Sequence, residues 1–175
     1  IAAIFGAATV AIFQSDVKRM FAYSSVGQIG YITLGLALAT VTGVTGGLVH
    51  LLNHAMIKAA IFMGLGAVFF RVGGIEFKDI AGIGRRMPIT MSAIGIACLS
   101  LIGVPGTAGF VSKWALLSAT LGEGRWIVAV LLLLSSLLAL VYVGRILTVV
   151  ILSPRPANAP RVTEAPSWMV IPTIV

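Results

Sequence analysis

Residues 46–70 read GGLVHLLNHAMIKAAIFMGLGAVFF and give the strongest indication of the fold of this chain. The segment is long and apolar enough for a membrane-spanning helix, which needs about 20 such residues. It nevertheless contains His50, His54 and Lys58. Lys58 lies near the middle of the segment, where its side chain is too short to reach the membrane surface. Because ionisable groups inside a bilayer are costly, we interpret these residues as functional candidates.

The rest of the chain has the same apolar character. Hydrophobic residues make up 59% and charged residues 10% of the sequence, whereas a soluble domain has about 25% charged residues. One soluble core could not bury so much apolar surface. We expect an all-α, polytopic transmembrane helical bundle. The predicted spans are 1–13, 20–39, 46–70, 88–104, 107–121 and 125–152, with the start of another at 167–175.

The formal net charge of +7 is gathered in short clusters between the predicted spans. Such clusters set membrane topology and do not form the continuous basic face that binds nucleic acid. The basic loops 14–19 and 71–86 are separated by two spans, so we expect them on the same side. Positive-inside logic assigns that side to the cytoplasm, and the uncharged loops 40–45 and 103–106 to the other. Cys98 has no partner for a disulfide within the chain and is interpreted as a small buried hydrophobe.

The two ends of the sequence lie within hydrophobic stretches. Ile1 has no basic segment before it, and a charged turn follows residue 13 where a signal peptide would have a small-residue cleavage site. We therefore expect that sequence is missing at both ends.

His50, His54 and Lys58 recur at intervals of four residues, which aligns them on one helix face beside Asn53. A single histidine in a span is usually a packing residue bonded to a backbone carbonyl. Three aligned ionisable groups favour a proton wire instead, since imidazole and amine groups can both exchange protons. Two histidines spaced in this way can also bind zinc. No Asp, Glu or Cys lies in the segment, so we predict no metal site.

Lys113 is the second intramembrane lysine. It lies in the segment 107–121, which is bounded by Gly103-Val104-Pro105-Gly106 and by Gly122-Glu123-Gly124. A helix of this length rises only about 22 Å, less than the hydrocarbon core. Short segments interrupted by Gly and Pro are typical of the discontinuous helices at transporter ion sites. The alternatives are an ordinary kinked span and an interfacial lysine anchored by Trp114.

Several other polar residues lie within the spans. Arg145 hardly deprotonates, so we predict a structural or snorkelling role. A polar stripe at helical spacing is formed by Ser24, Ser25, Gln28 and Tyr31. These side chains could hydrogen-bond to adjacent helices or hold a file of water molecules, and we favour hydrogen bonds to adjacent helices. No span contains Asp or Glu, so an acidic partner for the lysines must lie elsewhere. We find no nucleotide-binding loop and no cysteine cluster, and therefore expect no cofactor and no redox chemistry in this chain.

Three motifs in order give a family resemblance. Residues 14–31 (QSDVKRMFAYSSVGQIGY) resemble the DxKRxxAYSSxxxxGY stretch of the antiporter-like membrane subunits of respiratory complex I (NADH:quinone oxidoreductase) and of Mrp-type multisubunit cation/proton antiporters. Residues 50–58 are similar to the H-x3-H-x3-K helix of these subunits, and residues 101–114 to their GxPxTAGFxSK segment. Lys113-Trp114 and residues 82–88 resemble the branch that comprises the D-type Mrp and the N-like complex I proteins.

The resemblance implies a core of fourteen helices built from two inverted five-helix repeats. This chain would cover the second repeat, from the end of the eighth helix to the start of the fourteenth. Residues 1–153 would belong to the translocating domain, 154–166 to a proline-rich loop, and 167–175 to the next helix. The resemblance also implies that the loops 14–19 and 71–86 face the periplasm, against the charge rule.

The resemblance further assigns roles to the ionisable residues. Lys58 would be the central lysine of a half-channel, His50 and His54 the relay beside it, and Lys113 the exit-side residue on the broken twelfth helix. The glutamate–lysine pair of the family belongs to the first repeat, outside this chain.

We therefore expect a proton-translocating subunit of a complex in a prokaryotic inner membrane. Its partners would be other membrane subunits, the lipid bilayer, and protons or Na⁺, with no nucleic acid. A scaffold subunit whose lysines only pack and a stand-alone Na⁺/H⁺ exchanger remain open alternatives. The sequence does not decide between a complex I and an Mrp-type assembly.

Overall fold

A computed structural model describes residues 1–155 and 162–174, which are helical with no β-strand. The helices are α1 (Ala2–Ile12), α2 (Val17–Ala37), α3 (Val41–Val72), α4 (Phe77–Ile80), the 3₁₀ helix η1 (Ile83–Arg85), α5 (Pro88–Ile102), α6 (Ala108–Gly122), α7 (Trp126–Ile151) and α8 (Ser167–Ile174). The predicted all-α class is confirmed.

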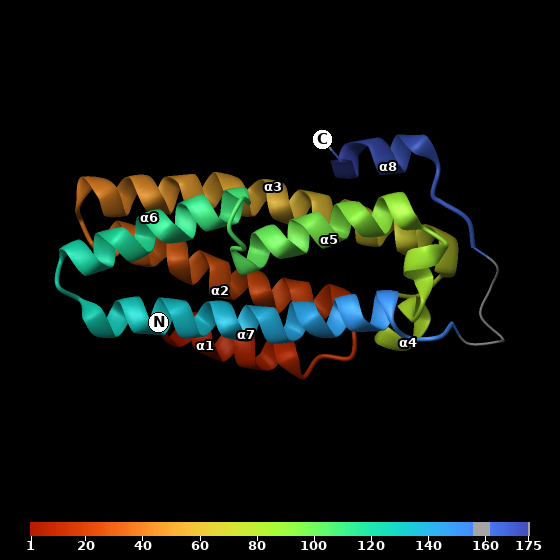
Figure 1. The fold of residues 1–175 in the computed structure, drawn as a ribbon, viewed down its shortest axis with the longest axis horizontal. Coiled ribbons are helices and arrows are strands. Elements are labelled where there is room, and N and C mark those ends of the chain that lie inside the picture. The colour runs from red at the N-terminus through yellow and green to blue at the C-terminus, as the bar shows by residue number, and fades with distance from the viewer. Residues whose placement is uncertain (156–161, 175) are drawn as a thin grey trace.

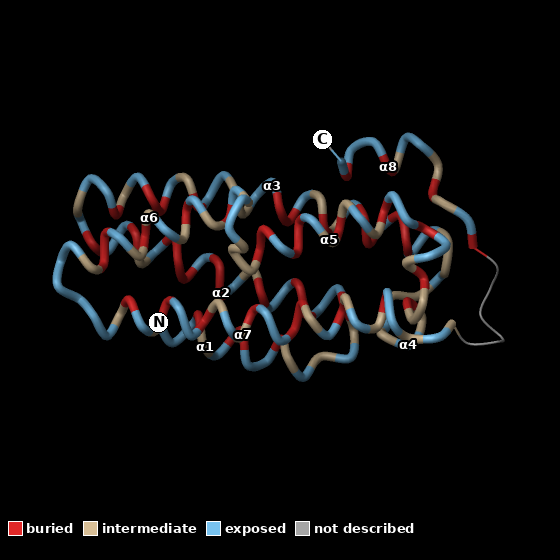
Figure 2. Tube along the Cα trace, in the orientation of Figure 1, coloured by how far each residue is buried: buried red, intermediate tan, exposed pale blue. Residues whose placement is uncertain are grey.

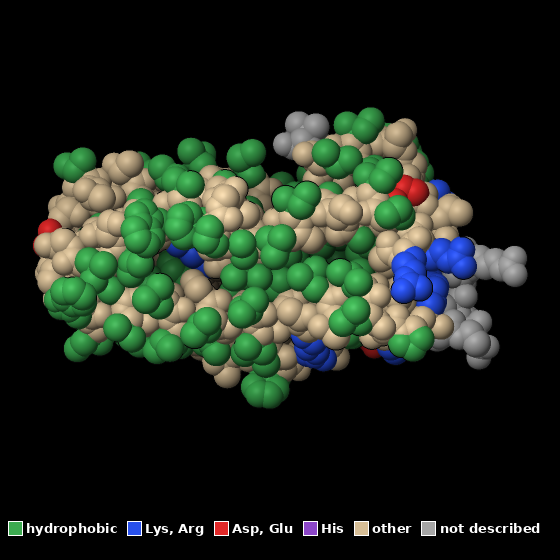
Figure 3. Space-filling model, in the orientation of Figure 1, with side chains coloured by type: hydrophobic (Ala, Val, Ile, Leu, Met, Phe, Trp, Pro, Cys, Tyr) green, Lys and Arg blue, Asp and Glu red, His purple; other side chains and the backbone are tan. Residues whose placement is uncertain are grey.

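The helices form an elongated bundle in which α2, α3 and α7 run along the long axis (Figure 1). Two of the helices, α3 and α7, are long and apolar enough to cross a membrane. Exposed residues are spread along the helices (Figure 2), and hydrophobic side chains cover much of the face drawn in Figure 3. Leu52 is 66% exposed and Ile127 78%. An apolar exterior of this kind suits lipid as the surrounding solvent.

Helices α5 and α6 lie end to end along one side of α3 (Figure 1). A Cβ at Gly46, near the start of α3, would lie 3.3 Å from the Leu116 side chain of α6. A Cβ at Gly64, later in α3, would lie 2.6 Å from the Ile94 side chain of α5. The two helices therefore follow one another antiparallel to α3. Each has 15 residues, a rise of about 22 Å, so together they make one crossing.

This arrangement corrects the prediction of two separate spans at 88–104 and 107–121. The chain leaves helix α5 at Gly103 (φ 92°), passes Pro105 and Gly106 (φ 91°), and resumes helix at Ala108. Left-handed backbone favours glycine, and proline has no N–H to donate, so helix cannot continue through this segment. The predicted discontinuity is confirmed, but the segment 103–106 lies at mid-length in the bundle and not at one of its ends (Figure 1).

The two basic loops lie at one end of the bundle, as predicted. Val17 N donates to Ile75 O at 3.2 Å, and Phe77 N donates to Ser15 O at 3.2 Å. The end of α7 lies at this same end, and the turn between α6 and α7 lies at the opposite end (Figure 1).

The segment before α8 is attached to the start of α5. Glu164 accepts hydrogen bonds from Ile89 N at 2.9 Å and Thr90 N at 3.3 Å, and from the Thr90 hydroxyl. Val162 and Ala165 are buried in the core. Residues 156–161 of the predicted 154–166 loop lie outside the described residues.

Candidate functional site

Lys58 points from α3 into the bundle toward α2. Its side chain is 7% exposed. Its Nζ donates to Phe21 O at 2.6 Å and to the Ser24 hydroxyl, and lies 5.2 Å from the centroid of the Phe21 ring. Its polar contacts are thus neutral oxygens, and no ion pair involves it among the residues described. A lysine held in this way can gain or lose a proton without separating a bound carboxylate.

His50 connects three helices through its two ring nitrogens. Nδ1 lies 2.9 Å from Ser112 Oγ on α6, and Nε2 lies 3.0 Å from Gln28 Oε1 on α2. His50 is 3% exposed. With an amide oxygen facing Nε2, that nitrogen carries the proton and Nδ1 accepts from the serine hydroxyl. An imidazole with both nitrogens engaged can take a proton on one side and release one on the other.

His54 lies between these two residues on α3 and is half-buried. Its Nδ1 is buried without a hydrogen-bond partner among the described residues. Asn53, next to it, donates to Ala108 O at 2.7 Å and ties α3 to the start of α6. In the predicted relay, the side chains of His50 and Lys58 are therefore held by hydrogen bonds to neighbouring helices, whereas Nδ1 of His54 has no such bond among the described residues.

Lys113 reaches into the break between α5 and α6. Its Nζ donates to Leu101 O at 3.0 Å and Ile102 O at 2.8 Å, and to Ser136 Oγ on α7 at 3.3 Å. The last carbonyls of a helix have no partner within it and form the negative end of its dipole. The break therefore supplies a cation site at mid-length in the bundle. Trp114, the anchor in the alternative interpretation, is 57% exposed and stacks on the Phe110 ring.

Tyr31 lies between the histidine and this second lysine. Its ring centroid is 5.3 Å from that of His50 and 5.1 Å from Lys113 Nζ. Its hydroxyl is bonded to the Ser135 hydroxyl on α7. Beside it is a cavity of about 10 Å³, whose lining includes Ser24, Gln28, Tyr31 and Ser135. That volume is close to the minimum for one water, and the polar lining would bind it.

Three residues of the predicted polar stripe on α2, Ser24, Gln28 and Tyr31, hydrogen-bond to adjacent helices, as favoured, whereas the Ser25 hydroxyl donates to Phe21 O of its own helix at 3.2 Å. Ser24 accepts from Lys58 and Gln28 from His50. Sequence patterns alone did not identify Ser112 or the pair Ser135–Ser136. Two features of the sequence could have indicated them: Ser112 directly precedes Lys113, and Ser135 and Ser136 are adjacent polar residues within a run of leucines.

Arg145 has the predicted structural role. Its guanidinium donates to Ile12 O at 2.9 Å and Gln14 O at 2.7 Å, and stacks over the Phe77 ring at 4.0 Å. It thereby caps the carbonyl end of α1 and stays apart from the lysines.

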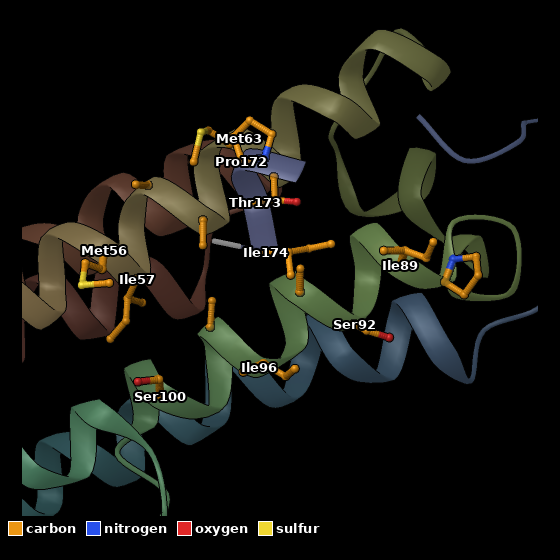
Figure 4. Close-up of a pocket in the computed structure, with 15 residues that line it drawn as sticks. Met56, Ile57, Met63, Ile89, Ser92, Ile96, Ser100, Pro172, Thr173 and Ile174 are labelled. Carbon is orange, nitrogen blue, oxygen red and sulfur yellow. The ribbon is translucent and has the colours of Figure 1, made fainter. Parts of the chain in front are cut away.

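A groove of about 670 Å³ lies between α3, α5 and α8 (Figure 4). Its lining is mainly apolar, with Ser92, Ser100 and Thr173 as hydroxyl groups, and no ionisable side chain lines it among the residues that the structure describes. It does not suit an ion. In the part of the chain that the structure covers, no three His, Cys, Asp or Glu side chains are grouped as metal ligands would be.

The fold and the site together define a helical membrane protein with a buried lysine, a second, half-buried lysine and a broken helix. Residues 1–139 match the family model described as NADH:quinone oxidoreductase/Mrp antiporter, transmembrane. The chain belongs to this family.

Two relatives illustrate the similarity. The chain is 41% identical over 184 residues to NADH-quinone oxidoreductase subunit N of Desulforudis audaxviator, covering 98% of this chain and 36% of that protein. It is 36% identical over 179 residues to F(420)H(2) dehydrogenase subunit L of Methanosarcina mazei, covering 95% of this chain and 26% of that protein. The chain thus spans about a third of the first relative and about a quarter of the second.

Solved structures show the same fold. A chain of the Mrp complex from Dietzia sp. superposes with a TM-score of 0.92 at 24% identity, over 99% of this chain and 40% of that one. A chain of the membrane-bound sulfane sulfur reductase, an archaeal respiratory membrane complex, superposes with a TM-score of 0.91 at 34% identity, over 98% of this chain and 28% of that one.

Proposed function

We propose that this chain translocates protons, or exchanges a cation for protons, as a membrane subunit of a respiratory NADH:quinone oxidoreductase or an Mrp-type antiporter complex in a prokaryotic inner membrane. The observation that carries the proposal is the line of polar groups inside the bundle that runs from Lys58 through Ser24, Gln28, His50 and Tyr31 to the half-buried Lys113. Membership of the family and the similarity to subunits of such complexes support it.

Each group in the line has a chemical task. Lys58 takes up a proton and passes it through Ser24 and water in the adjacent cavity. His50, assisted by His54, relays the proton by exchanging which ring nitrogen carries it. Lys113 receives it at the break, where the α5 carbonyls stabilise its ammonium form. Water at the break then accepts the proton, since irregular backbone at membrane depth can line a hydrated path.

The acidic partner of the lysines must come from outside this chain. All five Asp and Glu residues lie at helix ends or in loops: Asp16, Glu76, Asp79, Glu123 and Glu164. A neighbouring subunit of the complex would supply the carboxylate.

The test uses the full-length protein, assembled in its complex and reconstituted in liposomes with a pH-sensitive dye inside. We expect Lys58→Ala and Lys113→Ala to lower coupled proton transport at least tenfold while assembly is retained. Lys18→Ala, at an exposed position in the first turn of α2, is the matched control and should transport like the wild type.

Three results would contradict the proposal. Normal transport by both variants would show that the lysines are not on the path. Failed assembly, with normal transport by whatever complex does form, would favour the scaffold alternative. Full exchange activity by the protein reconstituted alone would instead identify a stand-alone exchanger.

A further inference from the structure

A second polar cavity, of about 390 Å³, lies at the basic end of the bundle, away from the lysine line. Its lining includes Gly82, Arg85 and Arg86 on one side, and Ile151, Leu152 and Arg155 on the other. Lys and Arg side chains gather at this end of the surface in Figure 3. The cavity is therefore a cationic hollow between the η1 turn and the end of α7.

The two sides of the cavity are held in place by backbone contacts. Gly82 has φ 65° and its N donates to Val149 O at 3.0 Å. A Cβ at this glycine would lie 2.7 Å from Ser153 O, so the turn packs directly on the chain leaving α7. A Cβ at Gly84 would lie 3.0 Å from Val150 O. Close packing of this kind fixes the backbone of Arg85 and Arg86 on one wall of the cavity and the backbone of Arg155 on the other.

The acidic residues at this end are bonded elsewhere. Asp16 accepts from Arg19 N, Glu76 pairs with Lys78, Asp79 accepts from Glu76 N, and Glu164 caps α5. Arg85 and Arg86 are exposed and form no ion pair with any residue in the ranges 1–155 and 162–174. The positive charge of this wall is therefore not neutralised by those carboxylates.

We propose that this cavity binds the phosphate headgroup of an anionic phospholipid. Guanidinium groups donate paired hydrogen bonds to phosphate oxygens. The cavity lies at the end of a membrane-spanning helix, where basic pockets meet lipid headgroups.

Two lining residues favour a lipid over free phosphate or an acidic peptide. Ile151 and Leu152, at the end of α7, are 56% and 74% exposed. They are apolar side chains beside a cationic hollow, and they continue the lipid-facing surface of the helix. A molecule with both a phosphate and acyl chains satisfies the two parts of the site together.

The test measures lipid retention by the full-length protein in its complex. Complexes are purified from nanodiscs that contain phosphatidylglycerol and phosphatidylcholine, and retained lipid is counted by native mass spectrometry. We expect phosphatidylglycerol to be retained selectively, and retention to fall at least tenfold in the double variant Arg85→Gln/Arg86→Gln. Arg125→Gln, an exposed arginine at the opposite end, is the control and should retain lipid like the wild type.

Further arms identify the ligand. Arg85→Lys/Arg86→Lys keeps the charge but not the paired geometry, so partial retention is expected. Equal retention of both lipids, or no loss in the double Gln variant, would overturn the proposal. Displacement of the lipid by millimolar inorganic phosphate would assign a free-phosphate site instead. Loss of a partner subunit with unchanged lipid would assign an acidic protein surface. Proton transport is not the readout, so this outcome is independent of the proposed relay.

Discussion

At the scale of single residues, His50 depends on partners that come from two other helices. Ser112 is fully buried and its hydroxyl lies 2.9 Å from His50 Nδ1. The same hydroxyl is 3.1 Å from Gly109 O, so its single proton can point to either acceptor. Such a hydroxyl can both orient the imidazole and take part in proton transfer.

Ser112→Ala is expected to leave His50 Nδ1 without a partner. A buried polar group that loses its hydrogen bond costs about 1–3 kcal/mol, so we expect a roughly tenfold or greater fall in proton transport per assembled complex. Ser118→Ala, on the exposed face of the same helix, should transport normally. Unchanged transport in Ser112→Ala would show that the serine only packs.

The positions of the ionisable residues along the sequence were sufficient to identify them as candidates. Lys58 and His50 were recognisable because charged groups in an apolar run have few structural explanations. Their partners Ser24, Gln28 and Ser112 are common, uncharged residues, and only the packing of α2 and α6 against α3 shows which of them are bonded.

At the scale of elements, the junction between α5 and α6 determines where Lys113 lies. Gly109 packs against the Ser100 backbone, and its N donates to the Ser100 hydroxyl at 3.0 Å. This close approach holds the first turn of α6 beside the end of α5. It therefore places the Lys113 amine within reach of Leu101 O and Ile102 O.

Gly109→Ala is expected to separate the two half-helices. The added methyl group would overlap the Ser100 carbonyl, and overpacking of this kind costs about 1–3 kcal/mol. We expect a lower midpoint of thermal unfolding in detergent and weaker proton transport, because Lys113 moves away from the α5 carbonyls.

Gly122→Ala on the same helix is the matched control. No atom lies within 4 Å of its Cβ position, so its thermal midpoint and transport should equal those of the wild type. Equal midpoints for Gly109→Ala and the wild type would contradict the packing argument.

At the scale of the whole molecule, the pairing of α5 with α6 as one crossing changes the topology. If α5 and α6 each crossed the membrane, the end of α7 would lie on the side of the membrane opposite to Lys78 in α4. As one crossing, they place Lys78 and Leu152 on the same side and Glu123 on the other, in agreement with Figure 1.

Labelling of introduced cysteines checks this arrangement in sealed vesicles of known orientation. A membrane-impermeant maleimide should label Lys78→Cys and Leu152→Cys from one side and Glu123→Cys from the other, since all three positions are exposed. Native Cys98 is buried and should remain unlabelled. Labelling of Lys78→Cys and Glu123→Cys from the same side would restore the two-span count.

The amino-acid sequence was enough to predict an all-helical membrane protein, because apolar runs as long as a bilayer is thick are stable as helices in lipid. It was also enough to predict the family and the helix break, and to single out Lys58, His50, His54 and Lys113 as candidates. The tertiary structure was needed to show that the segments on either side of residues 103–106 make a single crossing. It alone showed that Lys113 contacts α5 carbonyls and that Tyr31 lies beside His50. These contacts depend on which helix faces pack together, and local hydrophobicity carries no information on that choice.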